Sequence, residues 1–271
     1  MKPEQVIVTG GFDDIRSRDL RFLEEAAKLG PLTVALWPDE ILKKLTGKPP
    51  KFPLAERLYF LNAVRFAGCV VPAADSVWVD ELPADCHATL WADVESSANR
   101  ERERFCRENN LTYHVFKPED LKGFPEAPPL EQPAPGKKVI VTGSFDWFHS
   151  GHVRFFEEAS HYGDLYVMVG QDANIRLLKG AGHPLLRQEE RRYVAGTIKF
   201  VKQALICSGQ GWLDAAPDIE RLKPDISAVN EDGDKGGKRE YCETHGIQYL
   251  VLKRVPAPGL PTRTSTNLRG F

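Results

Sequence analysis

The chain has 271 residues, of which 42% are hydrophobic and 27% charged, a composition typical of globular proteins and a length sufficient for two domains. Its formal net charge of −2 excludes the broad basic field that holds a nucleic-acid backbone. We therefore expect no nucleic-acid partner, and any phosphate chemistry must depend on local cationic groups.

The spacing of the cysteines and the length of the apolar runs bear on the cellular compartment. The five cysteines form no C-x-x-C pair and are odd in number, which indicates reduced thiols rather than a disulfide framework. No apolar run approaches the roughly 20 residues needed to cross a bilayer. The N-terminus, MKPEQVIVTGG, lacks the charged and apolar regions of a signal peptide. We expect a cytoplasmic protein without a membrane span.

The N-terminal half contains a pattern that returns later in the chain. The stretch VIVTGGFDDIRSRDLRFLEEA from Val6 aligns without a gap with VIVTGSFDWFHSGHVRFFEEA from Val139. Weaker matches follow in the same order: LAERLYFLNAVRFAGCVV near Leu54 with QEERRYVAGTIKFVKQALI, and FCRENNLTYHVF near Phe105 with YCETHGIQYLVL. Three matches in one order predict a tandem duplication.

A proline-rich segment separates the two copies. Residues 118–136 read PEDLKGFPEAPPLEQPAPG, which favours neither a helix nor a central strand. We predict a first domain over residues 1–117, a semi-rigid linker over 118–136, and a second domain over 137–271.

The second copy alternates between strand and helix patterns. Short β-branched or apolar runs predict buried strands, and amphipathic runs predict helices between them. In chain order we expect strands at Val139–Thr142 and Leu165–Gly170, a helix at Glu189–Val201, and strands at Gln203–Cys207, Ile226–Val229 and Gln248–Leu252. The alternation predicts an α/β fold made of two tandem Rossmann-like, doubly wound parallel-sheet domains, with ligands at the carboxyl ends of the strands.

The loop after the first of these strands carries the strongest chemical signal. It reads GSFDWFHSGH, with His149 and His152 three residues apart, Gly151 between them, and a predicted helix directly after. A helix N-terminus favours an anion, and a glycine admits a phosphate close to the backbone. The alternative is that one or both histidines are helix caps. The spacing in this context favours imidazoles that hold the α-phosphate of a nucleotide.

These residues resemble the G-x-F-D-x-x-H-x-G-H signature of the cytidylyltransferase-like nucleotidyltransferases. That family includes glycerol-3-phosphate and phosphoethanolamine cytidylyltransferases and the adenylyltransferase domain of ADP-heptose synthase. Three further stretches are similar to family segments: DANIRLLKG from Asp172, EERRYVAGTIKFV from Glu189, and RTSTNLR at the C-terminus. Asn230 departs from the pattern, because the family usually carries a glycine there.

The resemblance implies the following site. The catalytic residues would be His149, His152 and Lys179. The nucleotide-binding residues would be Gly143, Ser144, Phe145, Gly151, Asp232, Arg263, Thr264, Ser265 and Thr266. Arg191 and Arg192 would bind the acceptor, with only one of them facing the site. No residue is expected to bind a metal directly, and Mg²⁺ would arrive with the nucleoside triphosphate.

The first copy lacks these groups. Arg16, Arg18 and Asp19 stand at the positions of His149, Gly151 and His152. Because Asp19 would place a carboxylate where a phosphate should lie, we expect the first copy to be non-catalytic. It could instead form an intramolecular pseudo-dimer with the second, cover its acceptor pocket or bind a partner, and the chain could also form a homodimer.

The sequence thus predicts a nucleotidyltransferase that moves CMP or AMP from a nucleoside triphosphate to a small phosphorylated alcohol or sugar and releases pyrophosphate. CTP is slightly favoured by the tandem arrangement, and ATP is kept open by the DANIRLLKG stretch. The alternatives are an adenylyltransferase like that of ADP-heptose synthase, or a nucleotide-binding regulatory or scaffold protein without turnover.

Overall fold

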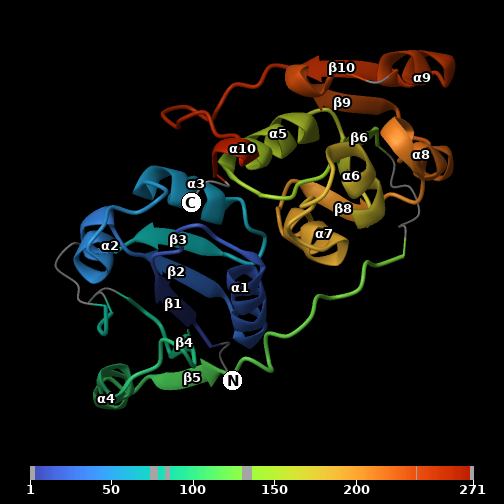
Figure 1. Ribbon diagram of the computed structural model, residues 1–271. Helices are drawn as coiled ribbons and strands as arrows, with labels where there is room; N and C mark the ends of the chain where they lie inside the picture. Colours follow the sequence, from blue (N-terminus) through green and yellow to red (C-terminus); the bar gives the residue numbers. More distant parts are fainter. Residues whose placement is uncertain (1–3, 74–78, 83–85, 130–135, 236, 269–271) are drawn as a thin grey trace. The chain divides into compact units, whose positions relative to one another are not determined.

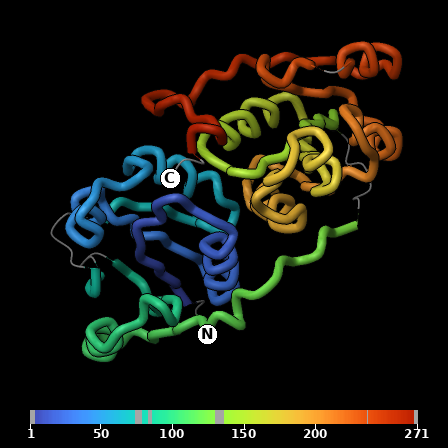
Figure 2. The backbone as a smooth tube through the Cα atoms, viewed as in Figure 1, coloured from blue at the N-terminus to red at the C-terminus, as the bar shows by residue number. Residues whose placement is uncertain are grey.

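The computed structural model describes residues 4–73, 79–82, 86–129, 136–235 and 237–268. The chain divides into two compact units, Met1–Gly123 and Phe124–Phe271, whose elements are labelled in Figure 1 and whose backbone path is followed in Figure 2. The division lies within the segment predicted to be the linker. Its residues 130–135 lie outside the described part of the chain.

The first unit is a five-stranded sheet with helices between its strands. Its elements are β1 (Val6–Gly10), α1 (Ser17–Leu29), β2 (Leu32–Leu36), α2 (Asp39–Thr46), α3 (Leu54–Asn62), β3 (Cys69–Pro72), β4 (Leu90–Val94), α4 (Arg100–Glu108) and β5 (Thr112–Phe116).

The second unit repeats this plan and adds short helices. Its elements are β6 (Lys138–Gly143), α5 (Ser150–Ser160), β7 (Asp164–Val169), α6 (Asp172–Lys179), α7 (Gln188–Gly196), β8 (Val201–Ile206), η1 (Gly211–Leu213), α8 (Ala216–Leu222), β9 (Ile226–Asn230), η2 (Glu231–Gly233), α9 (Lys238–Thr244), β10 (Gln248–Leu252) and α10 (Ser265–Leu268).

The two sheets have the same topology. The first has the order β3-β2-β1-β4-β5, and the second, counted from its other edge, has β8-β7-β6-β9-β10. Every strand pairing among the described residues is parallel. This confirms the prediction of two Rossmann-like α/β sheets, and the identical order supports the duplication.

Both faces of the second sheet are covered, as strand alternation requires. On one face, Ile140, Tyr166 and Met168 pack in a core cluster with side chains of α8 and α9. The intervening strand residues, such as Val141, point to the other face, and α5 and α7 contact β6, β7 and β8. The sheet is thus doubly wound, and its strands end together at one edge.

One predicted element was wrong in length. The helix predicted over Glu189–Val201 ends at Gly196, and β8 already begins at Val201. Thr197 closes the helix, because its backbone N–H and its hydroxyl both bond to carbonyls of the last turn. The helix therefore ends at the hydrogen-bonded turn of Thr197, where the apolar periodicity alone suggested continuation.

Candidate active site

The first loop of the second unit turns sharply between β6 and α5. Phe145 has a positive φ of 49°, and a side chain at Gly143 would come within 2.8 Å of the Phe145 ring. The glycine is therefore required by this close approach. The turn brings His149 to the N-cap of α5, directly beyond the carboxyl end of β6.

His149 has an unusual hydrogen-bonding state. Its Nδ1 accepts the backbone N–H of Gly151 at 3.1 Å, so the neutral ring carries its proton on Nε2. Nε2 is buried and has no hydrogen-bond partner within the described chain, and the residue is only 2% exposed. A buried donor without a partner is costly, which indicates that a ligand completes this site.

His152 lies against His149, with the two ring centroids 4.1 Å apart. Phe148 stacks on the His152 ring at 5.2 Å, and Phe145 meets it edge-on at 5.6 Å. Its Nδ1 is likewise buried and without a partner among the described residues. The site therefore presents two buried imidazoles, one of which packs between two phenylalanine rings.

Burial and neighbouring cations keep both rings neutral. Burial, followed by the charges of Arg254 and Arg263, lowers the pKa of His149 to about 3. Burial, His149, Arg254 and Lys179 hold the pKa of His152 well below its usual value. The charged side chains that lower these two pKa values, Arg254, Arg263 and Lys179, are all cations, so the field at the helix N-terminus favours an anion.

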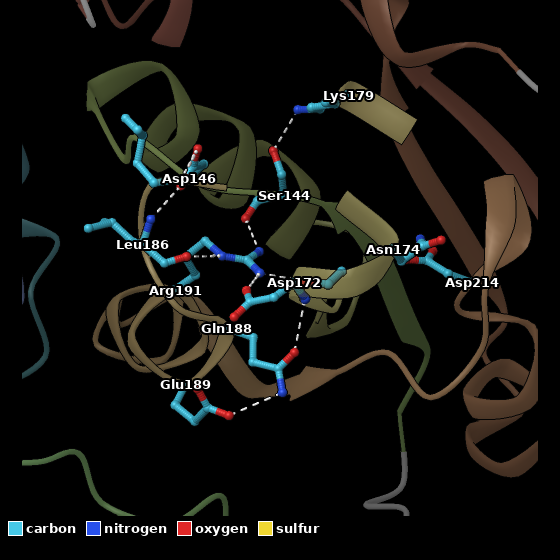
Figure 3. A network of polar contacts seen from close by, with 12 residues as sticks. Ser144, Asp146, Asp172, Asn174, Lys179, Leu186, Gln188, Glu189, Arg191 and Asp214 are labelled. Atoms are coloured by element: carbon cyan, nitrogen blue, oxygen red, sulfur yellow. Dashed lines mark hydrogen bonds and ion pairs between the residues drawn. The ribbon is translucent and has the colours of Figure 1, made fainter. Parts of the chain in front are cut away.

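Lys179 ends α6 and reaches back to the first loop. Its Nζ donates to the Ser144 hydroxyl at 2.9 Å, as Figure 3 shows. The side chain is exposed, so a ligand could reach it. The structure thus brings together the histidine pair, Ser144 and Lys179, which lie in separate segments of the sequence.

The terminal segment also reaches this place. Ser265 Oγ donates to the carbonyl of Trp147 at 3.2 Å, and Thr264 Oγ1 accepts the N–H of Asn267 at 3.2 Å at the start of α10. Arg263 is half-buried, whereas Thr266 is exposed on α10. The predicted phosphate-binding segment therefore lies beside the first loop.

Arg254 is the cation that sequence reasoning missed. Its Nη2 donates to the Arg263 carbonyl at 2.9 Å, and its Nη1 pairs with Asp232, which is exposed. The available signal was its position two residues after β10, at the same edge of the sheet. Arg254 thus joins the terminal segment to the loop after β9.

A pocket extends from this cluster along α5. Its walls come from one face of α5, the end of β9, and the segments after β10. The lining residues include Gly151, Arg154, Phe155, Asn230, Arg254 and Arg263. The Oδ1 of Asn230 is buried with no hydrogen-bond partner in the described chain, a second sign of a site that a ligand completes.

The two arginines predicted to bind the acceptor point elsewhere. Arg191 is fully buried and bonds to Ser144, Gly170, Asp172 and Leu186. Figure 3 shows its bonds to Ser144, Asp172 and Leu186. Arg192 is also buried, and its Nη2 donates to the Pro125 carbonyl. An acceptor role for either residue stays a prediction, and the structure gives both guanidinium groups protein partners.

The first unit has different chemistry at the equivalent turn. Phe12 has the same positive φ, 46°, as Phe145. However, Arg16 pairs with Asp14, and the Asp19 carboxylate accepts the backbone N–H of Arg16 at 2.8 Å. A carboxylate of the chain itself thus occupies the helix N-terminus that carries the histidine pair in the second unit.

Comparison with known proteins agrees with this geometry. The cytidylyltransferase-like family matches residues 140–255. The chain is 38% identical over 120 residues to a FAD synthase from Ferroglobus placidus, a match that spans 43% of this chain and 75% of that protein. The chain belongs to the cytidylyltransferase-like family. Its activity is therefore nucleotidyl transfer.

Two further likenesses are more partial. The bifunctional protein HldE from Geobacter sulfurreducens is 34% identical over 139 residues, which is 50% of this chain but only 27% of HldE. A solved lipopolysaccharide core biosynthesis protein from Thermoplasma volcanium is 22% identical, with a TM-score of 0.38, and covers 45% of this chain and 98% of its own.

The described residues contain no helix of sufficient length and apolar character to cross a membrane. They also contain no group of three or more His, Cys, Asp or Glu side chains placed to hold a metal ion.

Proposed function

We propose that the second unit transfers a nucleoside monophosphate, CMP or AMP, from a nucleoside triphosphate to a small phosphorylated alcohol or sugar. A phosphate oxygen of the acceptor forms a bond to the α-phosphorus, and the bond from the α-phosphorus to the bridging oxygen breaks. Pyrophosphate leaves with that oxygen and its electron pair. The attacking oxygen is already anionic, so the chain does not need to supply a nucleophile.

The observation that carries this proposal is the buried, neutral histidine pair at the start of α5. Nε2 of His149 and Nδ1 of His152 have no partners within the described chain, and the charged side chains that lower the pKa values of the two rings are all cations. Preorganised donors in a water-poor site stabilise charge that develops during transfer. Both histidines would bind the α-phosphate, with Gly151 allowing its close approach.

The surrounding cations fit the leaving group. Lys179 and Arg263 would bind the β- and γ-phosphates and stabilise departing pyrophosphate. Thr264, Ser265 and Thr266 would offer hydroxyl and N–H groups from the terminal segment. Asp232, by its ion pair with Arg254, would fix the loop beside the nucleotide.

The cations beside the histidine pair suit phosphate groups rather than a metal ion. Mg²⁺ would be held by triphosphate oxygens and water, and would neutralise phosphate charge when bound.

The relatives bear on the nucleotide. FAD contains an adenylyl group, so the similarity to a FAD synthase favours ATP, whereas the tandem arrangement favours CTP. A nucleotide-binding scaffold without turnover is the alternative from another class. The unpartnered histidine nitrogens argue against it, because a scaffold has no need of preorganised donors at the α-phosphate.

The test is pyrophosphate release with CTP, ATP, GTP and UTP, each with glycerol 3-phosphate, phosphoethanolamine, sugar 1-phosphates and FMN. We expect acceptor-dependent release with CTP or ATP and at least one phosphorylated acceptor. Nucleotide binding without release for every pair would support the scaffold alternative.

A further inference from the structure

One buried side chain in the second unit ties together the loops that form the site. Arg191 Nε donates to the carbonyl of Leu186 at 3.0 Å, and Nη1 donates to that of Ser144 at 2.6 Å. Its Nη2 donates to the Gly170 carbonyl and to Asp172 Oδ1, both at 2.7 Å. Figure 3 shows the bonds to Ser144, Asp172 and Leu186 radiating from one guanidinium group, which is 0% exposed.

The four partners come from three separate connections between elements of the second unit. Ser144 follows β6, Gly170 follows β7, Asp172 begins α6, and Leu186 lies just before α7. Asp146 adds a second connection, because its carboxylate accepts the N–H groups of Leu185 and Leu186 at 2.8 and 2.9 Å. A rigid, forked donor such as arginine suits this multiple bridging, and a lysine would not replace it.

The first unit contains the same arrangement without the catalytic histidines. Arg57, 2% exposed, donates from Nε to the Phe52 carbonyl at 2.9 Å and from Nη1 to Gly11 and Trp37 carbonyls at 2.5 and 2.9 Å. Its Nη2 donates to Asp39 Oδ1 at 2.6 Å. Because this unit has Arg16 and Asp19 in place of the histidines, the arginine persists where the phosphate site is absent. A substrate contact is therefore not needed to explain it.

The units differ in what this arginine supports. In the second unit, Arg191 bonds the Ser144 carbonyl while Lys179 bonds the Ser144 hydroxyl at 2.9 Å. Arg191 also holds Asp172 at the beginning of α6, the helix that ends at Lys179. It thus fixes both the helix that carries the lysine and the residue that the lysine contacts.

The equivalent positions in the first unit lack this extension. Gly11 aligns with Ser144 and has no hydroxyl, and Thr46 aligns with Lys179 and bonds to the carbonyl of Leu42. The arginine bridge is common to both units. At these described positions, only the second unit connects it to a cation, through Ser144 to Lys179.

We propose that Arg191 is a positioning residue of the nucleotide site, which fixes Ser144 and Lys179 for the triphosphate and does not contact the acceptor. This inference rests on the proposed function of the second unit. It replaces the acceptor role that the family resemblance implies for Arg191.

The duplication supplies a matched control. Arg191→Lys and Arg57→Lys remove the same bridge from equivalent places in the full-length chain, so both should lower the melting temperature to a similar extent. The affinity for Mg-CTP and Mg-ATP, measured by calorimetry well below the melting temperature, should change differently. We expect Arg191→Lys to raise Kd about tenfold, equivalent to 1.4 kcal/mol, and Arg57→Lys to change it by less than about twofold.

A double-mutant cycle with Lys179→Ala tests whether Arg191 acts through the lysine. If it does, Arg191→Lys should have little further effect on Kd once Lys179 is absent. Additive effects would overturn this route. Asp146→Asn and Asp13→Asn form a second matched pair if the arginine variants fail to fold, and the same contrast in Kd is expected.

Other outcomes distinguish failure of the positioning role of Arg191 from failure of the proposed function. Unchanged nucleotide Kd for Arg191→Lys, or Kd raised equally by Arg57→Lys, would overturn the positioning role. An unchanged Kd with a raised acceptor KM would instead establish acceptor contact. A wild-type chain that binds neither CTP nor ATP would overturn the proposed function, and the positioning role with it.

Discussion

His149 uses its two ring nitrogens for two purposes. Nδ1 caps α5 by accepting the Gly151 N–H, whereas Nε2 is a buried donor with no partner within the described chain. The cap and the phosphate ligand, which are alternatives at the level of sequence, are therefore compatible in one side chain. The two roles can be tested separately, because asparagine is a good N-cap but has no donor at the position of His149 Nε2.

We predict that His149→Ala and His149→Asn both lower turnover by at least about 100-fold, the usual size for loss of one preorganised donor. Stability should distinguish them. The alanine variant should lose about 1 kcal/mol with the cap, and the asparagine variant should retain most of it. Chemical denaturation and steady-state rates check this. An asparagine variant with near wild-type turnover would show that His149 is only a cap.

Acid should destabilise the second unit through the same histidine. The folded pKa of His149 is about 3 and its ordinary value is 6.5, so between these values the unfolded chain binds a proton that the folded chain excludes. The contribution of neutral His149 to the free energy of unfolding is present above pH 6.5 and is lost progressively as the pH is lowered toward 3. At pH 5.5 the loss is roughly 1 kcal/mol.

His149→Asn should flatten that dependence. The free energy of unfolding of both proteins can be measured by urea titration from pH 7.5 to 5. As the pH falls, the wild type should lose more of it than the variant does. Parallel curves would mean that His149 is not held neutral in the folded protein.

Sequence reasoning reached some of these residues and not others. The histidines and Lys179 were accessible because a spaced motif marks them, and the structure brings them together. Arg254 was not, because it follows β10 without any motif and acts through space on both rings. Arg191 carried a motif, but its bonds to three separate connections depend on tertiary packing.

Side-chain contacts hold the terminal segment against the site. Arg254 connects the Arg263 carbonyl to Asp232, and Ser265 bonds to the first loop. Because α10 spans only Ser265–Leu268, it is too short to be stable by itself in water. Its place beside α5 must therefore depend on such tertiary contacts.

We predict that Arg254→Gln weakens triphosphate binding about tenfold or more, since it removes a cation that acts on both histidines and releases the terminal segment. Lys253→Gln is the matched control. Lys253 has the same charge and lines the same pocket, but it is exposed and is not among the charges that lower the pKa of either histidine. Calorimetry with CTP and ATP checks this, and equal losses for the two variants would show a general charge effect.

The strands were more predictable than the helix ends. Short β-branched runs such as Val139–Thr142 favour a buried strand. In the structure this strand is longer by one residue at each end. The α7 helix was predicted five residues too long, because apolar periodicity continues past Gly196 while the backbone turns. The hydrogen bonds of Thr197 end the helix, and they cannot be predicted from the apolar periodicity of the sequence.

At the scale of the whole molecule, the two units show what the fold needs and what the chemistry adds. Both have the same strand order, the same positive-φ phenylalanine and the same buried arginine. The histidine pair, Ser144 and Lys179 belong to the second unit, and the first has Arg16, Asp19, Gly11 and Thr46 instead. The duplication could be predicted from aligned sequence, whereas the shared hydrogen-bond bridge required the structure.

Nucleotidyl transfer by the second unit moves the α-phosphoryl group together with its nucleoside. The direct measurement is incubation of the chain and a pool of phosphorylated acceptors with CTP or ATP labelled with ³²P at the α- or the γ-position. His149→Asn and Arg16→Asn change equivalent positions in the two units. We predict that α-label enters a product with the acceptor and γ-label appears in pyrophosphate, and that His149→Asn abolishes both while Arg16→Asn leaves them intact. Transfer of γ-label to the acceptor would rule out nucleotidyl transfer, and equal loss in both variants would rule out a specific role for His149.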